Sequence, residues 1–346
     1  MPEPSPDNPD KTTIEESNMK RIRFAQLGLG LLTVLGLSSS AVAGGRNPGS
    51  LLLYPEFDNR VGDATVLTVT NTSTTDDVTV HFVYIGRYGS GGADLNCEEF
   101  DRFADLTPND TLTVLTNLHN PQQEQGYVYA YAYENGQAVE ANVLIGNLLV
   151  INGLEAFEYS VNPWVFDRVG EGDGDDILDL DGSEYEACTT EIQVPRFLGQ
   201  GSRVNSELVL LGLSGGSEYT TTANFWVYND NEDPFSAQYT FRCWDRTNII
   251  DVSDVFDNQW LIDNSGQNIN KKLGADLEYG WFRIHGGTAS AGACSISDAT
   301  VYGMYIEIIG GSAAADLPFE HEDPADGHLL PRLLTGDNSE NEGGCF

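Results

Sequence analysis

The sequence predicts an all-β protein: two tandem antiparallel β-sandwich domains of immunoglobulin-like or jelly-roll size, placed after a signal peptide. Three observations lead to this prediction. Runs rich in Val, Thr, Tyr and Phe alternate with polar residues and recur between clusters of Gly, Asn and Asp. No stretch after the signal peptide has the 3.6-residue apolar period of an amphipathic helix. Similar segments also recur in the same order in the two halves of the chain.

The chain starts with a targeting segment. Residues 19–23 are basic, residues 24–37 form a 14-residue apolar stretch, and Ala41-Val42-Ala43 matches a small-residue cleavage site. Fourteen apolar residues are too few to span a bilayer. We therefore expect residues 1–43 to be an N-terminal extension and secretory signal peptide. The mature protein would be periplasmic, extracellular or on the cell surface, without a stable membrane span.

The predicted strands have the composition and alternation of half-buried β-structure, and turn residues separate them. Their short, fairly regular spacing favours sandwiches over a parallel sheet. The clearest predicted strands are Thr65–Thr70, Val78–Ile85, Thr111–Leu115, Tyr127–Tyr133, Glu207–Leu213, Ala223–Tyr228, Gln238–Cys243 and Val301–Ile309.

Internal similarity predicts that the second sandwich is a duplicate of the first, although two β-rich, Gly-rich halves can also resemble each other by chance. Because the matches keep their order, we place domain 1 at residues 50–166 and domain 2 at residues 192–310. The matched segments are Leu53–Phe57 with Gln193–Phe197, Cys97 and Asp101-Arg102 with Cys243 and Asp245-Arg246, Gly126-Tyr127 with Gly280-Trp281, and Ile145–Gly153 with Tyr302–Gly310.

Two acidic segments flank the second predicted domain. Residues 167–191 form a linker with ten acidic residues and one Arg, and residues 311–346 form an acidic C-terminal tail. Both are expected to be loop-like, although Leu329–Leu334 is apolar enough to pack back on a domain.

The overall charge excludes one class of function. The chain has 53 acidic and 17 basic residues, for a formal net charge of −36. Such a surface repels a phosphate backbone, so a nucleic-acid-binding role is excluded. The charge suits a protein that works in salty or calcium-containing water, where ions relieve self-repulsion.

The five cysteines permit disulfides in an exported protein, and their odd number leaves at least one unpaired or intermolecular. Cys243 with Cys294, both in the second predicted domain, is the preferred pair. Cys97 with Cys188 is the second choice, and Cys345 is then left over.

One segment of the acidic linker resembles a single copy of a calcium-binding repeat. Carboxylates spaced two residues apart and separated by glycines supply the hard oxygen ligands and sharp turns that Ca²⁺ requires. A plain acidic linker is the alternative, because that repeat normally works in stacked copies. The candidate ligands are Asp173, Asp175, Asp176, Asp179 and Asp181.

Four tyrosines alternate along one predicted strand and so share one face: Tyr127, Tyr129, Tyr131 and Tyr133. The matching strand in the second half, residues 281–285, has Phe282 and Ile284 as its inward set. By this comparison the tyrosines point outward and form a surface for a sugar or a protein partner. Packing against the second domain or the tail, or in the core, is the alternative.

The sequence contains no recognisable catalytic constellation. Gly212–Gly216 fits the nucleophile-elbow pattern G-x-S-x-G, but a strand pattern rather than a helix follows it, which indicates a hairpin loop. We therefore expect a secreted or cell-surface protein that is not an enzyme and that has a structural, adhesive or interaction role. A carbohydrate-binding module, with or without Ca²⁺, is the first alternative, and a secreted hydrolase is the second. An extracellular protein or glycan is the expected partner, and no other cofactor is expected.

Overall fold

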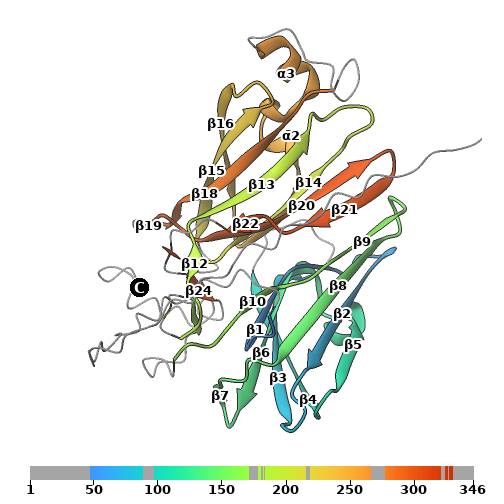
Figure 1. The fold of residues 1–346 in the computed structure, drawn as a ribbon, viewed down its shortest axis with the longest axis vertical. Coiled ribbons are helices and arrows are strands. Elements are labelled where there is room, and N and C mark those ends of the chain that lie inside the picture. The colour runs from blue at the N-terminus through green and yellow to red at the C-terminus, as the bar shows by residue number, and fades with distance from the viewer. Residues whose placement is uncertain are drawn as a thin grey trace, which may run out of the picture. The chain divides into compact units, whose positions relative to one another are not determined.

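The computed structural model describes residues 47–88, 97–170, 178–180, 182, 184–215, 219–265, 277–320, 324–325 and 327–329. The protein is mostly β, and its paired strands run antiparallel (Figure 1). The prediction of an all-β fold with antiparallel sheets is therefore confirmed. We call residues 49–166 the first half and residues 191–320 the second half. The N-terminal segment 1–43 lies outside the described residues.

The first half contains two sheets that enclose a core. One has the strand order β10-β1-β6-β3-β4, with β7 beside β6, and the other has the order β5-β2-β8-β9. Tyr54 on β1 donates a hydrogen bond to the carbonyl of Thr68 on β2, so the two sheets face each other across the core. The strands are β1 (Leu51–Asp58), β2 (Asp63–Asn71), β3 (Val78–Tyr88), β4 (Glu98–Leu106), β5 (Thr111–Leu115), β6 (Gln123–Glu134), β7 (Gln137–Ala138), β8 (Leu144–Asn152), β9 (Phe157–Val161) and β10 (Trp164–Phe166).

The second half has the same layout. Its sheets have the orders β22-β13-β18-β15-β16, with β19 beside β18, and β17-β14-β20-β21. Its core is a separate apolar cluster that includes Phe197, Phe225 and Phe282. The strands are β13 (Glu191–Leu198), β14 (Glu207–Gly212), β15 (Thr220–Asn229), β16 (Pro234–Phe241), β17 (Trp244–Asn248), β18 (Tyr279–Ala291), β19 (Cys294–Ser297), β20 (Val301–Ile309), β21 (Ser312–Asp316) and β22 (Phe319–Glu320).

Short helices that the sequence did not predict connect some of these strands. They are α1 (Thr116–His119), α2 (Ile249–Val252), α3 (Asn258–Asn264) and the 3₁₀ turn η1 (Asp254–Phe256). Elements of three to seven residues are at most two turns long, so they leave no apolar periodicity in the sequence. No helix among the described residues is long and apolar enough to cross a membrane.

Specific positions correspond between the halves. Both β1 and β13 contain a register shift just before a phenylalanine, and Phe57 and Phe197 then pair with Gly126 and Gly280. A Cβ on either glycine would lie 2.0 Å from a carbonyl oxygen of the neighbouring strand, which explains why both are glycine. The predicted match of Cys97 and Asp101 with Cys243 and Asp245 is wrong. The first pair lies at β4, whereas Cys243 and Asp245 lie at β17, the counterpart of β5.

The acidic linker and tail are not simply loops. The linker contains β11 (Leu178–Leu180) and β12 (Cys188–Thr189), which pair with the tail strands β24 (Gly327–Leu329) and β23 (Pro324–Ala325). Further back, β21 and β22 belong to the two sheets of the second half, so that half extends beyond the predicted boundary at 310. The linker and tail strands pair through backbone N–H and C=O groups, which every residue except proline has. The acidic side-chain composition therefore gave no sign of this pairing.

The two halves contact each other through the start of β17. A disulfide joins Cys97 to Cys243, with their Cα atoms 6.3 Å apart. Next to it, Trp244 donates its indole N–H to the carbonyl of Pro55 at 2.9 Å. The following residue on the same face, Arg246, is 3.2 Å from the carboxylate of Glu56. This segment therefore fastens the second half to β1 of the first.

Candidate functional site

The predicted exposed tyrosine ladder is wrong. Tyr127 and Tyr129 are completely buried, and Tyr131 is 7% exposed. Tyr133 is only partly buried, at the end of the row. The outer face of β6 belongs to the same apolar cluster as the second-half residues Val209, Leu211, Trp244, Tyr302 and Met304. Intramolecular packing, the alternative interpretation, is what the structure shows. The tyrosine face is hidden because second-half residues and the linker residue Tyr185 pack in the same cluster.

A hydrogen-bonded chain lies at the open end of this tyrosine face. The hydroxyl of Tyr131 is 2.6 Å from Nδ1 of His81, and Nε2 of His81 is 2.8 Å from Asp101. Phe103 stacks on His81 with its ring centroid 4.1 Å away and is 52% exposed. Burial, together with the hydrogen bond and charge of Asp101, raises the pKa of Glu99 to about 8. Although burial opposes it, hydrogen bonding to His81 and Glu99 lowers the pKa of Asp101.

The raised pKa of Glu99 predicts a pH-dependent stability. The folded protein holds a proton on Glu99 that the unfolded chain releases between its ordinary pKa of 4.5 and about 8. The contribution to stability is therefore complete below about 4.5 and is lost as the pH rises through about 8. We expect Glu99→Gln to melt at a higher temperature than wild type at pH 8.5 and to show a shallower fall between pH 5 and 8.5.

Thermal melts across this range provide the measurement, and Glu158→Gln, which changes an exposed carboxylate on β9, is the control. The control should keep the wild-type slope. An unchanged slope in Glu99→Gln would contradict the raised pKa of Glu99 as the source of the pH dependence.

The predicted calcium ligands fall almost entirely outside the described residues. Asp173, Asp175, Asp176 and Asp181 are not described, and Asp179 is described only as a backbone position on β11, paired with His328. Within the part of the chain that the structure describes, no group of three or more His, Cys, Asp or Glu side chains could hold a metal ion.

The predicted pairing of Cys243 with Cys294 is wrong, as is the second choice of Cys97 with Cys188. Cys243 pairs with Cys97 across a sequence separation of 146 residues. Cys294 is disulfide-bonded as well, and Cys188 is a buried free thiol. Cys345 lies outside the described residues. Because the prediction assumed that a disulfide forms within one domain, it could not find one that joins the two halves.

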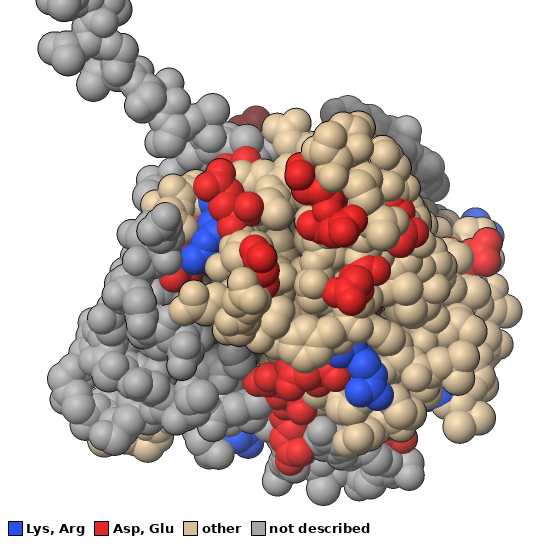
Figure 2. All heavy atoms as spheres, turned by 90° about the horizontal axis from the view of Figure 1, so that it is seen from below, with Lys and Arg blue, Asp and Glu red and all other residues tan. Residues whose placement is uncertain are grey.

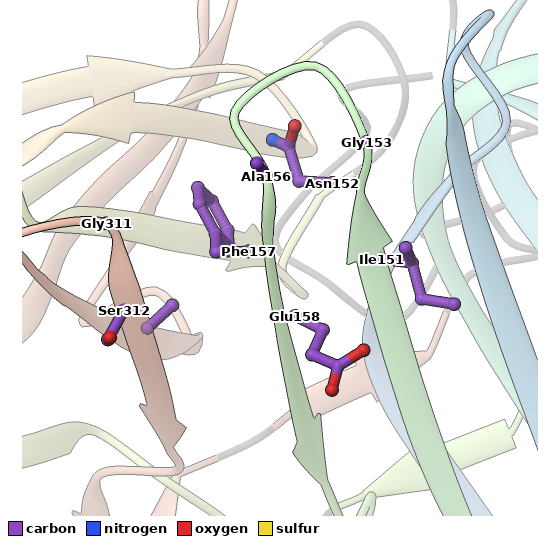
Figure 3. Close-up of a pocket in the computed structure, with 9 residues that line it drawn as sticks. Ile151, Asn152, Gly153, Ala156, Phe157, Glu158, Gly311 and Ser312 are labelled. Atoms are coloured by element: carbon purple, nitrogen blue, oxygen red, sulfur yellow. The ribbon is translucent and has the colours of Figure 1, made fainter.

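One hollow lies between two hairpins, that of β8 and β9 and that of β20 and β21 (Figure 3). It encloses about 430 Å³ and is lined by Ile151, Asn152, Gly153, Ala156, Phe157, Glu158, Gly311, Ser312 and Ala313. Glu158 is the one ionisable side chain among these residues. A second hollow is lined by amides such as Asn120 and Gln123, which hydrogen-bond to each other. Neither hollow brings together groups suited to a reaction.

Ser214, the serine of the G-x-S-x-G pattern, is also structural. It is 4% exposed, and its hydroxyl accepts a hydrogen bond from the backbone N–H of Thr300 at 2.9 Å. The predicted hairpin is wrong, however, because β14 and β15 do not pair and belong to different sheets of the second half.

A candidate binding face lies instead on the outer side of the second half's larger sheet. We call it the aromatic face; it consists of Trp226, Tyr228, Trp281, Arg283 and His285, which lie on the adjacent strands β15 and β18. Trp226 is 38% exposed. The intervening residues Phe282 and Ile284 are completely buried, which confirms the predicted inward set. The face therefore corresponds to the tyrosine face of the first half, but it is accessible to solvent.

The side chains of the aromatic face hold one another in position. Tyr228 stacks on Trp281, with ring centroids 4.8 Å apart and planes at 13°. The guanidinium carbon of Arg283 lies 6.0 Å from the ring of Trp226 and 5.7 Å from that of Trp281. The same guanidinium is 3.3 Å from the carboxylate of Glu191. Such a preorganised face loses little side-chain entropy when it binds a partner.

The hydrogen bond with Tyr228 raises the pKa of Arg283, as does the charge of Glu191, so the Arg283 side chain stays positively charged at all relevant pH values.

The sequence did carry a signal for the aromatic face. Trp226 and Tyr228 alternate on the predicted strand Ala223–Tyr228, and Trp281, Arg283 and His285 alternate on the predicted strand at residues 281–285. The sequence-based prediction placed the ligand surface on the first half instead, where four alternating tyrosines are more conspicuous.

Comparison with known proteins adds little to this geometry. No protein-family model matches the chain, and no curated protein is significantly similar to it. A crystal structure of Thermotoga maritima 1070 is similar to 34% of this chain and 96% of its own, with 9% sequence identity and a TM-score of 0.25. A likeness this weak carries no argument about either fold or function.

Proposed function

We propose that the protein is an exported, non-enzymatic interaction protein with an adhesive or structural role on the cell surface or outside the cell. In this proposal the first half is a scaffold and the second half presents the aromatic face to an extracellular partner. The observation that carries the proposal is the contrast between two equivalent sheet faces: one is buried by docking, whereas the other leaves Trp226 38% exposed beside Arg283.

We further propose that the two halves arose by duplication. The shared strand order supports this origin, as do the register shifts that precede Phe57 and Phe197. After duplication, the outer face of one copy could become an internal contact while that of the other kept a binding role. Export is proposed from the basic, apolar and A-x-A segments within residues 19–43.

The experiment is a binding assay of residues 44–346 on whole cells and on immobilised extracellular material, in Ca²⁺ and in EDTA. We expect the double variant Trp226→Ala with Trp281→Ala to bind at least about tenfold more weakly, because aromatic anchors dominate binding energy. Phe103→Ala is the matched control, since it removes a 52% exposed aromatic side chain from the first half. If the wild-type protein binds in Ca²⁺ but not in EDTA, this result would support the additional proposal of a calcium site in the linker.

Two results would overturn the proposed function. One is binding that survives the double variant but fails in Phe103→Ala, which would move the site to the first half. The other is turnover of a substrate by the purified protein that a single substitution abolishes, which would make it an enzyme.

A further inference from the structure

We infer that the aromatic face binds an uncharged polysaccharide chain, laid across the strands of the second half's larger sheet. This inference rests on the proposed function, because it names the chemical class of the partner for the same face. Three features of the face carry it: the balance of its charges, its unpaired neutral donors, and the spacing of its exposed rings.

The charges on the face do not call for an ionic partner. The positive charge of Arg283 is already balanced by Glu191, 3.3 Å away. The chain as a whole has a net charge of −36, which repels anionic polymers and also a second copy of the chain. On the side of the molecule drawn in Figure 2, clusters of acidic side chains outnumber the basic ones. An uncharged partner avoids both the repulsion and the cost of removing water from an additional charge.

The polar groups on the face are mostly neutral donors and acceptors. Among the described residues, the indole N–H groups of Trp226 and Trp281 donate no hydrogen bond. The amide of Gln238 donates to Asn224 at 2.7 Å, so these two amides form a fixed polar pair beside the rings. Apolar ring surface interspersed with uncharged donors complements a sugar, whose C–H faces pack on aromatic rings while its hydroxyls form hydrogen bonds.

The spacing of the exposed rings favours an extended ligand. Phe319, Gln193, Arg283 and Trp226 are direct neighbours across four adjacent strands, in that order. Three strand spacings separate the two outer members by about 14 Å. Phe319 is 64% exposed and Trp226 is 38% exposed. Several linked sugar rings span this length, whereas a monosaccharide reaches only one of the two aromatic ends.

The test is affinity electrophoresis of residues 44–346 in native gels that contain one soluble polysaccharide each. The neutral probes are hydroxyethylcellulose, xyloglucan and laminarin, and the anionic probe is alginate. We expect retardation in at least one neutral gel and none in alginate. Trp226→Ala and Phe319→Ala should each weaken this retardation at least about fivefold, whereas Phe103→Ala should match wild type.

Thermal melts of each variant show whether it folds, and Trp226→Phe, which keeps a ring on the sheet, should retain most of the retardation. Equal retardation in alginate, or retardation that Trp226→Ala leaves intact, would overturn the inference. The inference would also be overturned if no neutral gel retarded the protein while binding to cells still depended on Trp226. In that case the proposed function stands and the partner is a protein. If binding to cells is independent of the aromatic face, the proposed function fails as well.

Discussion

Replacing Arg246 with alanine should destabilise the protein by about 3–5 kcal/mol, the range measured when one partner is removed from a buried ion pair. Arg246 bonds to Glu207 on its own half, with 2.6 Å between the closest atoms, and to Glu56 of the first half at 3.2 Å. Glu56 is completely buried and also hydrogen-bonds to Tyr159. Without the guanidinium, Glu56 and Glu207 each lose the ion pair that they make with Arg246 at the contact between the halves.

The loss should depend on pH. Burial raises the pKa of Glu56, and the charge of Arg246 opposes this rise. In Arg246→Ala that opposition is gone, so Glu56 takes up a proton more readily and is then neutral. The variant should therefore regain part of its stability as the pH falls from 7 towards 5.

Urea unfolding at pH 7 and pH 5 measures both effects. Arg196→Ala is the matched control, because the Arg196 side chain is 63% exposed although it also pairs with a glutamate, Glu307. An exposed pair contributes at most about 1 kcal/mol. If Arg246→Ala and Arg196→Ala lost equal stability, the buried network would not hold the halves together.

Removing the disulfide between Cys97 and Cys243 should have an effect of similar size. The cross-link closes a loop with a sequence separation of 146 residues. The chain-entropy relation gives about 5 kcal/mol for such a loop, and measured values are usually about 2–4 kcal/mol. We expect the double variant Cys97→Ser with Cys243→Ser to have a lower unfolding midpoint. Because the variant lacks the Cys97–Cys243 cross-link, reductant can no longer destabilise it by cleaving that bond.

Cys188→Ser is the control, since Cys188 is a buried thiol that is not cross-linked. It removes a cysteine without opening a loop and should cost much less than the double variant. A double variant as stable as wild type would mean that the halves are already fixed by packing and by Arg246 alone. Because Cys243 and Arg246 lie three residues apart on the same fastening segment, the two losses should not be additive.

The sequence was most informative where one strand face is buried and the other is not. On β18, the inward orientation of Phe282 and Ile284 could be predicted, as could the outward orientation of Trp281 and Arg283, because alternation is a local property. The antiparallel, all-β architecture follows from the same signal. Most predicted strands lie within observed ones. Two extend past the observed end: Glu207–Leu213 past Gly212 of β14, and Gln238–Cys243 past Phe241 of β16.

Features that depend on distant contacts could not be predicted. Tyr127 and Tyr129 alternate as an exposed row would, but the outer face of a sheet can also be buried by another domain, and one strand does not distinguish these cases. The cross-link between Cys97 and Cys243 depends on how the halves dock. The pairing of β11 and β12 with the tail uses backbone groups and leaves no pattern in the acidic side chains.

The central claim is that equivalent sheet faces are used in two ways: one to dock the halves, the other to bind a partner. Hydroxyl-radical footprinting of residues 44–346, read by mass spectrometry with and without the bound partner, tests it most directly. We predict fast labelling of Trp226 and Phe319, protection of both when the partner binds, and slow labelling of Tyr127 and Tyr129 throughout. Tyrosines labelled as fast as Trp226, or protection confined to the first half, would contradict the account.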